Sequence, residues 1–221
     1  QLIRDWFINN RLSNFANPIE SVKKYRYLPR GFTSDKKVQQ DLVTYLSTFD
    51  TSIKGFKVER MEEDREDKPQ FKIYTKHQVI GTNSSQWISL KDESAGTLKM
   101  FALYQELQDT LDNGGVLFVD ELNARLHPLL LRHIIQRFLN QETNQHGAQL
   151  IFTSHDVSNM TNELLRRDEI WFVEKDKQGL SSLYSMAEYK DEAGESSRRD
   201  LNYMKNYLYG RYGGCLLYTS D

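Results

Sequence analysis

The stretch Val116-Leu-Phe-Val-Asp120-Glu121 decides the fold class, because four consecutive apolar residues end in two adjacent carboxylates. An apolar run of this length without polar alternation is typical of a strand that is buried on both faces of a parallel sheet. A second such run, Gln149-Leu-Ile-Phe-Thr-Ser-His155, ends in a histidine. Between the two runs, Pro128 stands where the first turn of a helix begins. We therefore expect a strand, helix and second strand in succession.

Helices and strands continue to alternate on both sides of this unit. Upstream, apolar residues at helical spacing from 98 to 111 predict a helix, and Asp112-Asn-Gly-Gly115 predicts its end. Downstream, we expect a helix over 157–166 and then a hairpin of strands 169–174 and 181–186. This alternation is typical of an α/β fold, in which helices cover a parallel sheet.

The N-terminal part has a different pattern. Apolar residues at helical spacing predict an amphipathic helix over 36–49. The charged stretch 61–70 reads as an exposed loop between two strands, 56–58 and 71–74, and 87–90 reads as a further strand.

Three polar side chains stand at the C-terminal ends of predicted strands, where open parallel sheets bind their ligands. Hydrolysis of a phosphoanhydride needs a divalent cation, a group that orients water and a group on the transferred phosphate. Asp120 would hold Mg²⁺ through oxygen, and Glu121 would accept a proton from the attacking water. His155 would hydrogen-bond the terminal phosphate. In the structural alternatives, the carboxylates merely begin a loop, and His155 or Asp156 caps the next helix.

Composition sets outer limits on the class of protein. The 221 residues carry a net charge of -2, but residues 1–60 hold eleven Lys or Arg against six Asp or Glu. This basic part could meet nucleic acid, or it could form a solvated helix face. No apolar run is long enough for a membrane span, and no signal peptide is recognisable. Cys215 is the only cysteine, so we expect no intrachain disulfide and a cytoplasmic location.

The last seven residues, 215–221, resemble a translation of the transposase adaptor that is used in DNA library preparation. We interpret them as an artefact of that kind, although Leu216-Leu-Tyr would also suit a short strand. With this tail and no initiator methionine, we expect a native segment that is cut at both ends.

These motifs resemble those of ABC-type ATPases. The strand that ends in Asp120-Glu121 resembles the Walker B motif, Asn123-Ala-Arg-Leu-His-Pro128 the D-loop, and His155 the switch histidine. Glu93-Ser-Ala-Gly-Thr97 resembles the signature motif. More narrowly, residues 70–214 resemble bacterial AAA/ABC-type ATPases of the abortive-infection kind, which are related to SMC and recombination-repair ATPases.

The resemblance implies a P-loop NTPase-type parallel sheet flanked by helices, of which this chain holds the C-terminal part. It implies a peripheral helical and strand segment over 1–70 and the ATPase core over 71–214. The cofactors are ATP and Mg²⁺, and two copies are bridged by nucleotide. Residues that would contact a nucleotide are those of the signature and the D-loop: Ser94, Ala95, Gly96, Thr97, Asn123, Ala124 and His127.

Two departures from the family pattern bear on these roles. His127 replaces an aspartate that is common in transporter ATPases, and Ala124 replaces a frequent serine, so His127 could instead cap the following helix. Ser94 is likewise a good helix cap. No GxxxxGK[ST] loop occurs in the 221 residues, and we interpret its absence as truncation.

The sequence therefore predicts Mg²⁺-dependent ATP hydrolysis by a nucleotide-bridged homodimer, and a fragment that is inactive alone. Phage defence or a process on DNA or RNA is the implied setting, with a nuclease or another effector as a possible partner. Two alternatives remain: a non-hydrolysing regulatory module of the same fold, and a metal-dependent nuclease.

Overall fold

The computed structural model describes residues 28–61, 71–79, 81–189 and 202–212, together with the backbone of residues 11–14. The chain divides into two compact units, residues 1–154 and residues 155–221. Each unit has its own elements and is described separately below.

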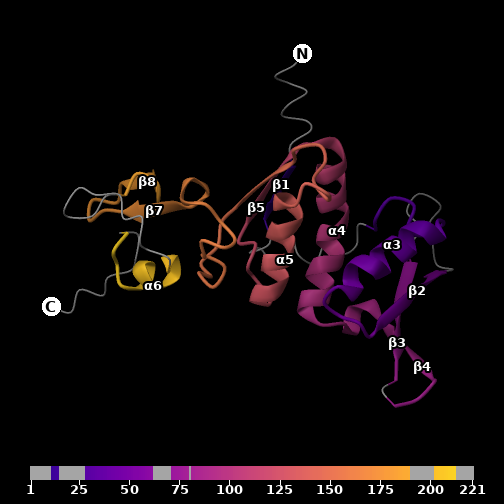
Figure 1. Cartoon of the computed structure of the whole chain (residues 1–221). Coiled ribbons are helices and arrows are strands. Elements are labelled where there is room, and N and C mark those ends of the chain that lie inside the picture. The colour runs from indigo at the N-terminus through magenta and orange to yellow at the C-terminus, as the bar shows by residue number, and fades with distance from the viewer. Residues whose placement is uncertain (1–10, 15–27, 62–70, 80, 190–201, 213–221) are drawn as a thin grey trace. The chain divides into compact units, whose positions relative to one another are not determined.

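A parallel sheet forms the centre of the first unit. Its strand order is β1 (Arg11–Asn14), β5 (Val116–Asp120) and β6 (Gln149–Phe152), and both neighbouring pairs are parallel. Figure 1 shows β1 beside β5. The predicted parallel strands and α/β class are confirmed, but the expected burial of both faces is wrong for β6, whose residues are exposed or half-buried in alternation. The strand β1 was not predicted, and it comes from the part of the chain that the sequence led us to expect at the periphery.

Helices α4 (Ala95–Asn113) and α5 (Pro128–Leu139) flank this sheet. Gly114 ends α4 in the left-handed conformation, with φ 66°, as the Asn-Gly-Gly sequence predicts. A Cβ at Gly114 would lie 2.3 Å from the His146 carbonyl oxygen, so no other residue fits there. At its own start, α5 has Pro128 in the first turn, and it buries Leu131, Ile134 and Ile135.

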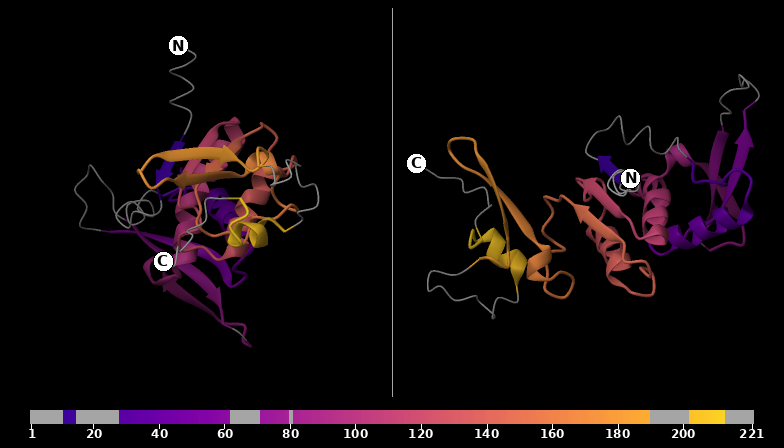
Figure 2. Two further views of the ribbon diagram at one scale, coloured as in Figure 1. Left: turned by 90° about the vertical axis from the view of Figure 1, so that its left-hand side faces the viewer. Right: turned by 90° about the horizontal axis from the view of Figure 1, so that it is seen from above.

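An antiparallel sheet stands at the other side of α4. It consists of β2 (Ile53–Arg60), β3 (Phe71–Gln78) and β4 (Ser85–Ser89), and helix α3 (Lys36–Ser47) packs on β2. These elements confirm the predicted helix and strands, and Figure 2 shows them together. Phe32, Phe56 and Phe101 stack edge to face, with ring centroids 5.1 and 5.6 Å apart, which joins the antiparallel sheet to α4.

The second unit contains a two-stranded hairpin, β7 (Trp171–Lys175) and β8 (Ser181–Ser185), with the short helix α6 (Tyr203–Leu208). Its core consists of Met160, Ile170, Phe172, Met186, Tyr203 and Tyr212. The predicted hairpin is confirmed.

The predicted helix over 157–166 is wrong, because these residues form turns that lead to the short 3-10 helix η2 (Arg167–Glu169). The Asp156 carboxylate accepts from the Ser158 amide at 2.8 Å, and Leu164 and Leu165 bond back to the Thr161 carbonyl. Asp, Ser, Asn and Thr side chains compete for backbone hydrogen bonds, and this local competition outweighed the apolar spacing.

The proposed adaptor-derived tail, 215–221, lies outside the described residues. None of the described helices is both long and apolar enough to cross a bilayer.

Candidate functional site

The carboxyl ends of β5 and β6 are joined by one threonine. Thr153 Oγ1 donates to Asp120 Oδ1 at 2.6 Å and accepts from the Glu121 amide at 2.8 Å. The Thr153 carbonyl also accepts from the Leu122 amide at 3.1 Å. Because these bonds hold both carboxylate residues to the neighbouring strand, the position of the Asp120-Glu121 pair is fixed by the sheet.

The chain leaves β5 through a turn whose two ends have unusual backbone angles. Glu121 has φ 52° and Arg125 has φ 63°, which is the left-handed region that non-glycine residues rarely adopt. Each such residue costs about 1–2 kcal/mol. We call residues 121–125 the 121–125 loop. Its strained ends persist only if surrounding contacts hold them, and strain of this kind gathers at functional sites.

One buried lysine supplies such contacts. Lys99, in α4, is 6% exposed, and its Nζ donates to the carbonyl oxygens of Glu121, Leu122 and Ala124 at 3.2, 2.7 and 2.6 Å. The pKa of Lys99 is lowered to about 7, chiefly by burial and secondarily by the charge of Arg125, while the charge of Glu121 acts in the opposite direction. The 121–125 loop is thus bonded to the helix that begins with the predicted signature motif.

The signature residues form the start of that helix. Ser94 caps α4: its Oγ accepts from the Thr97 amide at 3.1 Å and lies 2.9 Å from Thr97 Oγ1. No acidic residue lies in the first turn of this 19-residue helix. Ser94 and Ala95 are exposed, whereas Gly96 is half-buried. A Cβ at Gly96 would lie 3.6 Å from the Arg125 carbonyl oxygen, so the first turn lies against the far end of the 121–125 loop.

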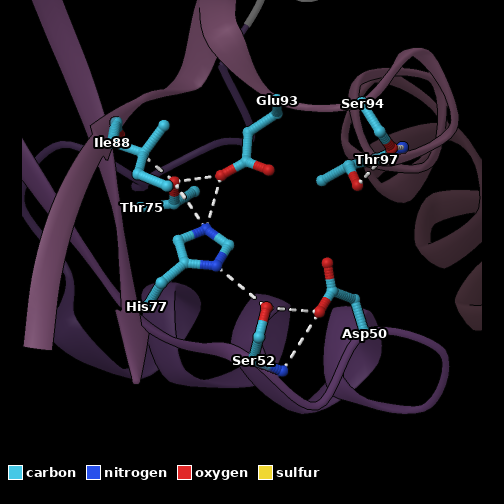
Figure 3. A network of polar contacts seen from close by, with 8 residues as sticks. All are labelled: Asp50, Ser52, Thr75, His77, Ile88, Glu93, Ser94 and Thr97. Atoms are coloured by element: carbon cyan, nitrogen blue, oxygen red, sulfur yellow. Dashed lines mark hydrogen bonds and ion pairs between the residues drawn. The ribbon is translucent and has the colours of Figure 1, made fainter. Parts of the chain in front are cut away.

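A buried polar network, drawn in Figure 3, holds the residue before this cap. Glu93, whose side chain is 7% exposed, has its Oε1 2.6 Å from His77 Nε2 and also accepts from the Thr75 hydroxyl. His77 Nδ1 in turn lies 2.8 Å from Ser52 Oγ, which donates to Asp50 Oδ1 at 2.6 Å. The antiparallel sheet therefore helps to fix the point at which α4 begins.

The predicted D-loop residues have structural partners in this chain. His127 caps α5, with its Nδ1 accepting from the Leu129 amide at 3.2 Å, as the alternative interpretation of this residue proposed. Asn123 is buried, and its carbonyl accepts from the Leu126 amide at 3.0 Å. The Ala124 carbonyl is one of the three acceptors of Lys99. These hydrogen bonds lie within one chain. The contacts of Asn123, Ala124 and His127 with a partner's nucleotide stay predictions.

His155 is the first residue of the second unit and is exposed. Since residues 155–166 form turns, the alternative in which His155 or Asp156 caps a following α-helix is wrong. The role of His155 toward a phosphate stays a prediction.

Within the described residues, no three His, Cys, Asp or Glu side chains gather around a point that could hold a metal ion. Asp120 would be the protein's carboxylate ligand for Mg²⁺. A carboxylate beside a threonine hydroxyl fits a hard cation that keeps most of its own water, because both groups offer oxygen.

The sequence patterns did not single out Lys99, Thr153 or His77, and they placed Glu93 in the signature motif without its contact to His77. Only Lys99 could have been identified from the sequence, because it is a single cation among the apolar residues 98–103, where a buried helix face is expected. The others look like ordinary strand or turn residues until the sheets are assembled.

A family model described as "AAA domain, putative AbiEii toxin, Type IV TA system" matches residues 2–160 of the chain. The match spans both predicted carboxylates, the signature residues and His155, and it includes residues 2–60, which precede the stretch 70–214 that carried the resemblance in the sequence. No curated protein matches the chain.

Proposed function

The chain belongs to this AAA-domain family, and we propose that it carries the metal ligand, the hydrolytic base and the partner-facing signature of an ATPase. An AAA domain implies nucleotide binding. The observation that supports hydrolysis best is the bridge from Thr153, which holds the Asp120 carboxylate and the Glu121 backbone at the ligand-binding end of a parallel sheet.

Asp120 and Glu121 have different tasks in this proposal. Asp120 would hold Mg²⁺, and the ion, when bound, neutralises charge on the phosphate oxygens. Glu121 would orient a water molecule and accept its proton. The left-handed backbone at Glu121 ends the strand geometry there, so its side chain does not follow the alternation of faces along β5.

Ser94, Ala95, Gly96 and Thr97 would contact the terminal phosphate of nucleotide that is held by a second copy of the chain. The start of a long helix with no acid in its first turn favours an anion, because its first amides lack helical partners and the helix dipole is positive there. Asn123, Ala124 and His127 would lie at the same junction between copies.

No GxxxxGK[ST] occurs within the 221 residues, and we propose that sequence outside them supplies the phosphate-binding loop. We therefore propose that the chain is the C-terminal part of the ATPase and binds ATP only weakly by itself, since backbone amides of such a loop supply most phosphate contacts. Defence against phage, a process on DNA or RNA, and a nuclease or other effector partner are the setting that we propose from the family alone.

Replacing Glu121 by Gln in the protein that contains this chain and its phosphate-binding loop tests the proposal. Phosphate release should fall by about 100-fold or more, while ATP binding persists and a dimer accumulates. Glu142→Gln, an exposed change between α5 and β6, is the matched control and should leave turnover unchanged. Unchanged turnover in Glu121→Gln would exclude Glu121 as the base, and a wild-type protein that binds but never hydrolyses ATP would make the chain a regulatory module.

A further inference from the structure

Lys99 has a geometry that is unusual for a helical lysine. It is almost fully buried in α4, and its Nζ lies within hydrogen-bond distance of three carbonyl oxygens of one turn. An ammonium group carries three N–H donors and no acceptor, so it matches a set of three carbonyls around a single point.

The three acceptor carbonyls belong to the 121–125 loop, whose backbone is strained at both ends. They are the carbonyls of Glu121, Leu122 and Ala124, in a loop whose ends, Glu121 and Arg125, both have positive φ. Along the same turn, the Ala124 amide donates to the Glu121 carbonyl at 3.0 Å, and the Leu126 amide donates to the Asn123 carbonyl at 3.0 Å.

A second contact reaches the same loop from the same face of α4. Gly96, one turn before Lys99, lies close to the Arg125 carbonyl, at a distance where a Cβ would make ordinary contact. Residues three apart share one face of a helix. The first two turns of α4 therefore lie along the loop, with Gly96 near Arg125 and the hydrogen bonds of Lys99 at Glu121, Leu122 and Ala124.

We propose that Lys99 is a positioning residue: it clamps the 121–125 loop to the signature helix, so that Glu121 and Ser94 move as one body. The effect of this clamp on hydrolysis rests on the proposed function, whereas the clamp itself rests on the hydrogen bonds of Lys99. When a partner's nucleotide contacts the start of α4, the clamp carries any shift of that helix to the backbone of the hydrolytic base within the same chain.

The clamp can be tested without ATP. In the 221-residue chain, Lys99→Met keeps an unbranched side chain but removes every donor, and it should speed amide hydrogen exchange of residues 121–126 about tenfold. Exchange in α3 and β2 should not change. Lys37→Met, on the exposed side of α3, is the matched control and should alter nothing in the loop. Unchanged exchange of residues 121–126 in Lys99→Met would overturn the clamp.

Lys99→Arg keeps the charge but spreads its donors over a flat fork, which cannot serve three carbonyls around one nitrogen. Amide hydrogen exchange of residues 121–126 in Lys99→Arg should be faster than in the wild type but slower than in Lys99→Met. This variant tests the proposal even if the methionine variant does not fold. Complete protection in Lys99→Arg would contradict the three-acceptor geometry.

Turnover then separates positioning from simple structural support. In the protein with its phosphate-binding loop, Lys99→Met should lower kcat about tenfold or more and leave the KM for ATP within about twofold. A loosened loop with normal kcat would overturn the positioning role. A wild-type protein without any hydrolysis would overturn the proposed function alone, because the exchange measurement does not depend on it.

Discussion

Thr153 Oγ1 donates a hydrogen bond to Asp120 Oδ1 at 2.6 Å, while the same hydroxyl accepts one from the Glu121 amide. This side chain, which directly follows β6, thus holds Asp120, the proposed metal ligand, and the backbone of Glu121, the proposed base. The link between the two strand ends depends on a residue outside the proposed Asp120-Glu121 pair.

Thr153→Val tests this bridge, since valine has nearly the same shape but no hydroxyl. We expect a loss of about 1–2 kcal/mol in the free energy of unfolding, because the Glu121 amide and the Asp120 carboxylate both lose a partner. Urea denaturation of the 221-residue chain measures it. Thr33→Val, at an exposed turn, is the control, and equal stability of the two variants would show that the bridge contributes nothing.

The network around His77 makes a separate prediction about the start of α4. His77→Ala leaves the buried Glu93 carboxylate without its imidazole partner, and we expect a loss of about 2–3 kcal/mol. The exposed His146→Ala is the control. A stability change no larger than that of His146→Ala, in the same urea titration, would mean that the network does not hold this junction.

The lowered pKa of Lys99 predicts the direction in which the free energy of unfolding changes with pH. Its pKa in the folded chain is about 7, below the ordinary 10.5, so between these values the unfolded chain binds more protons than the folded chain. The free energy of unfolding of the wild type should therefore rise with pH from 7 to 10 relative to that of Lys99→Met. Stability measured at intervals across this range checks the prediction, and a constant difference between the two proteins would refute it.

Much of the fold could be predicted because its signals are local. Gly114 follows a helical pattern and takes a positive φ that favours glycine, and Pro128 opens the next helix. The helix predicted over 157–166 failed for an equally local reason, since polar side chains there bond to nearby amides.

The supporting residues of the site could not be predicted in the same way. Lys99 meets carbonyls more than twenty positions away, and Thr153 meets Asp120 only because β5 and β6 are parallel and in register. Asp120 and Glu121 were recognisable because a strand end next to two carboxylates is a sequence pattern. The contacts that hold them depend on tertiary structure.

In the proposed dimer, Glu121 of one copy works on a nucleotide that touches Ser94 of the other copy. Mixing two inactive variants of the protein with its phosphate-binding loop, Glu121→Gln and Ser94→Arg, and measuring phosphate release tests this arrangement. A mixed dimer contains one site with both residues intact, and half of the dimers are mixed at equal concentrations. We expect activity to return to about a quarter of the wild-type rate. No recovery on mixing, or normal turnover by Ser94→Arg alone, would contradict it.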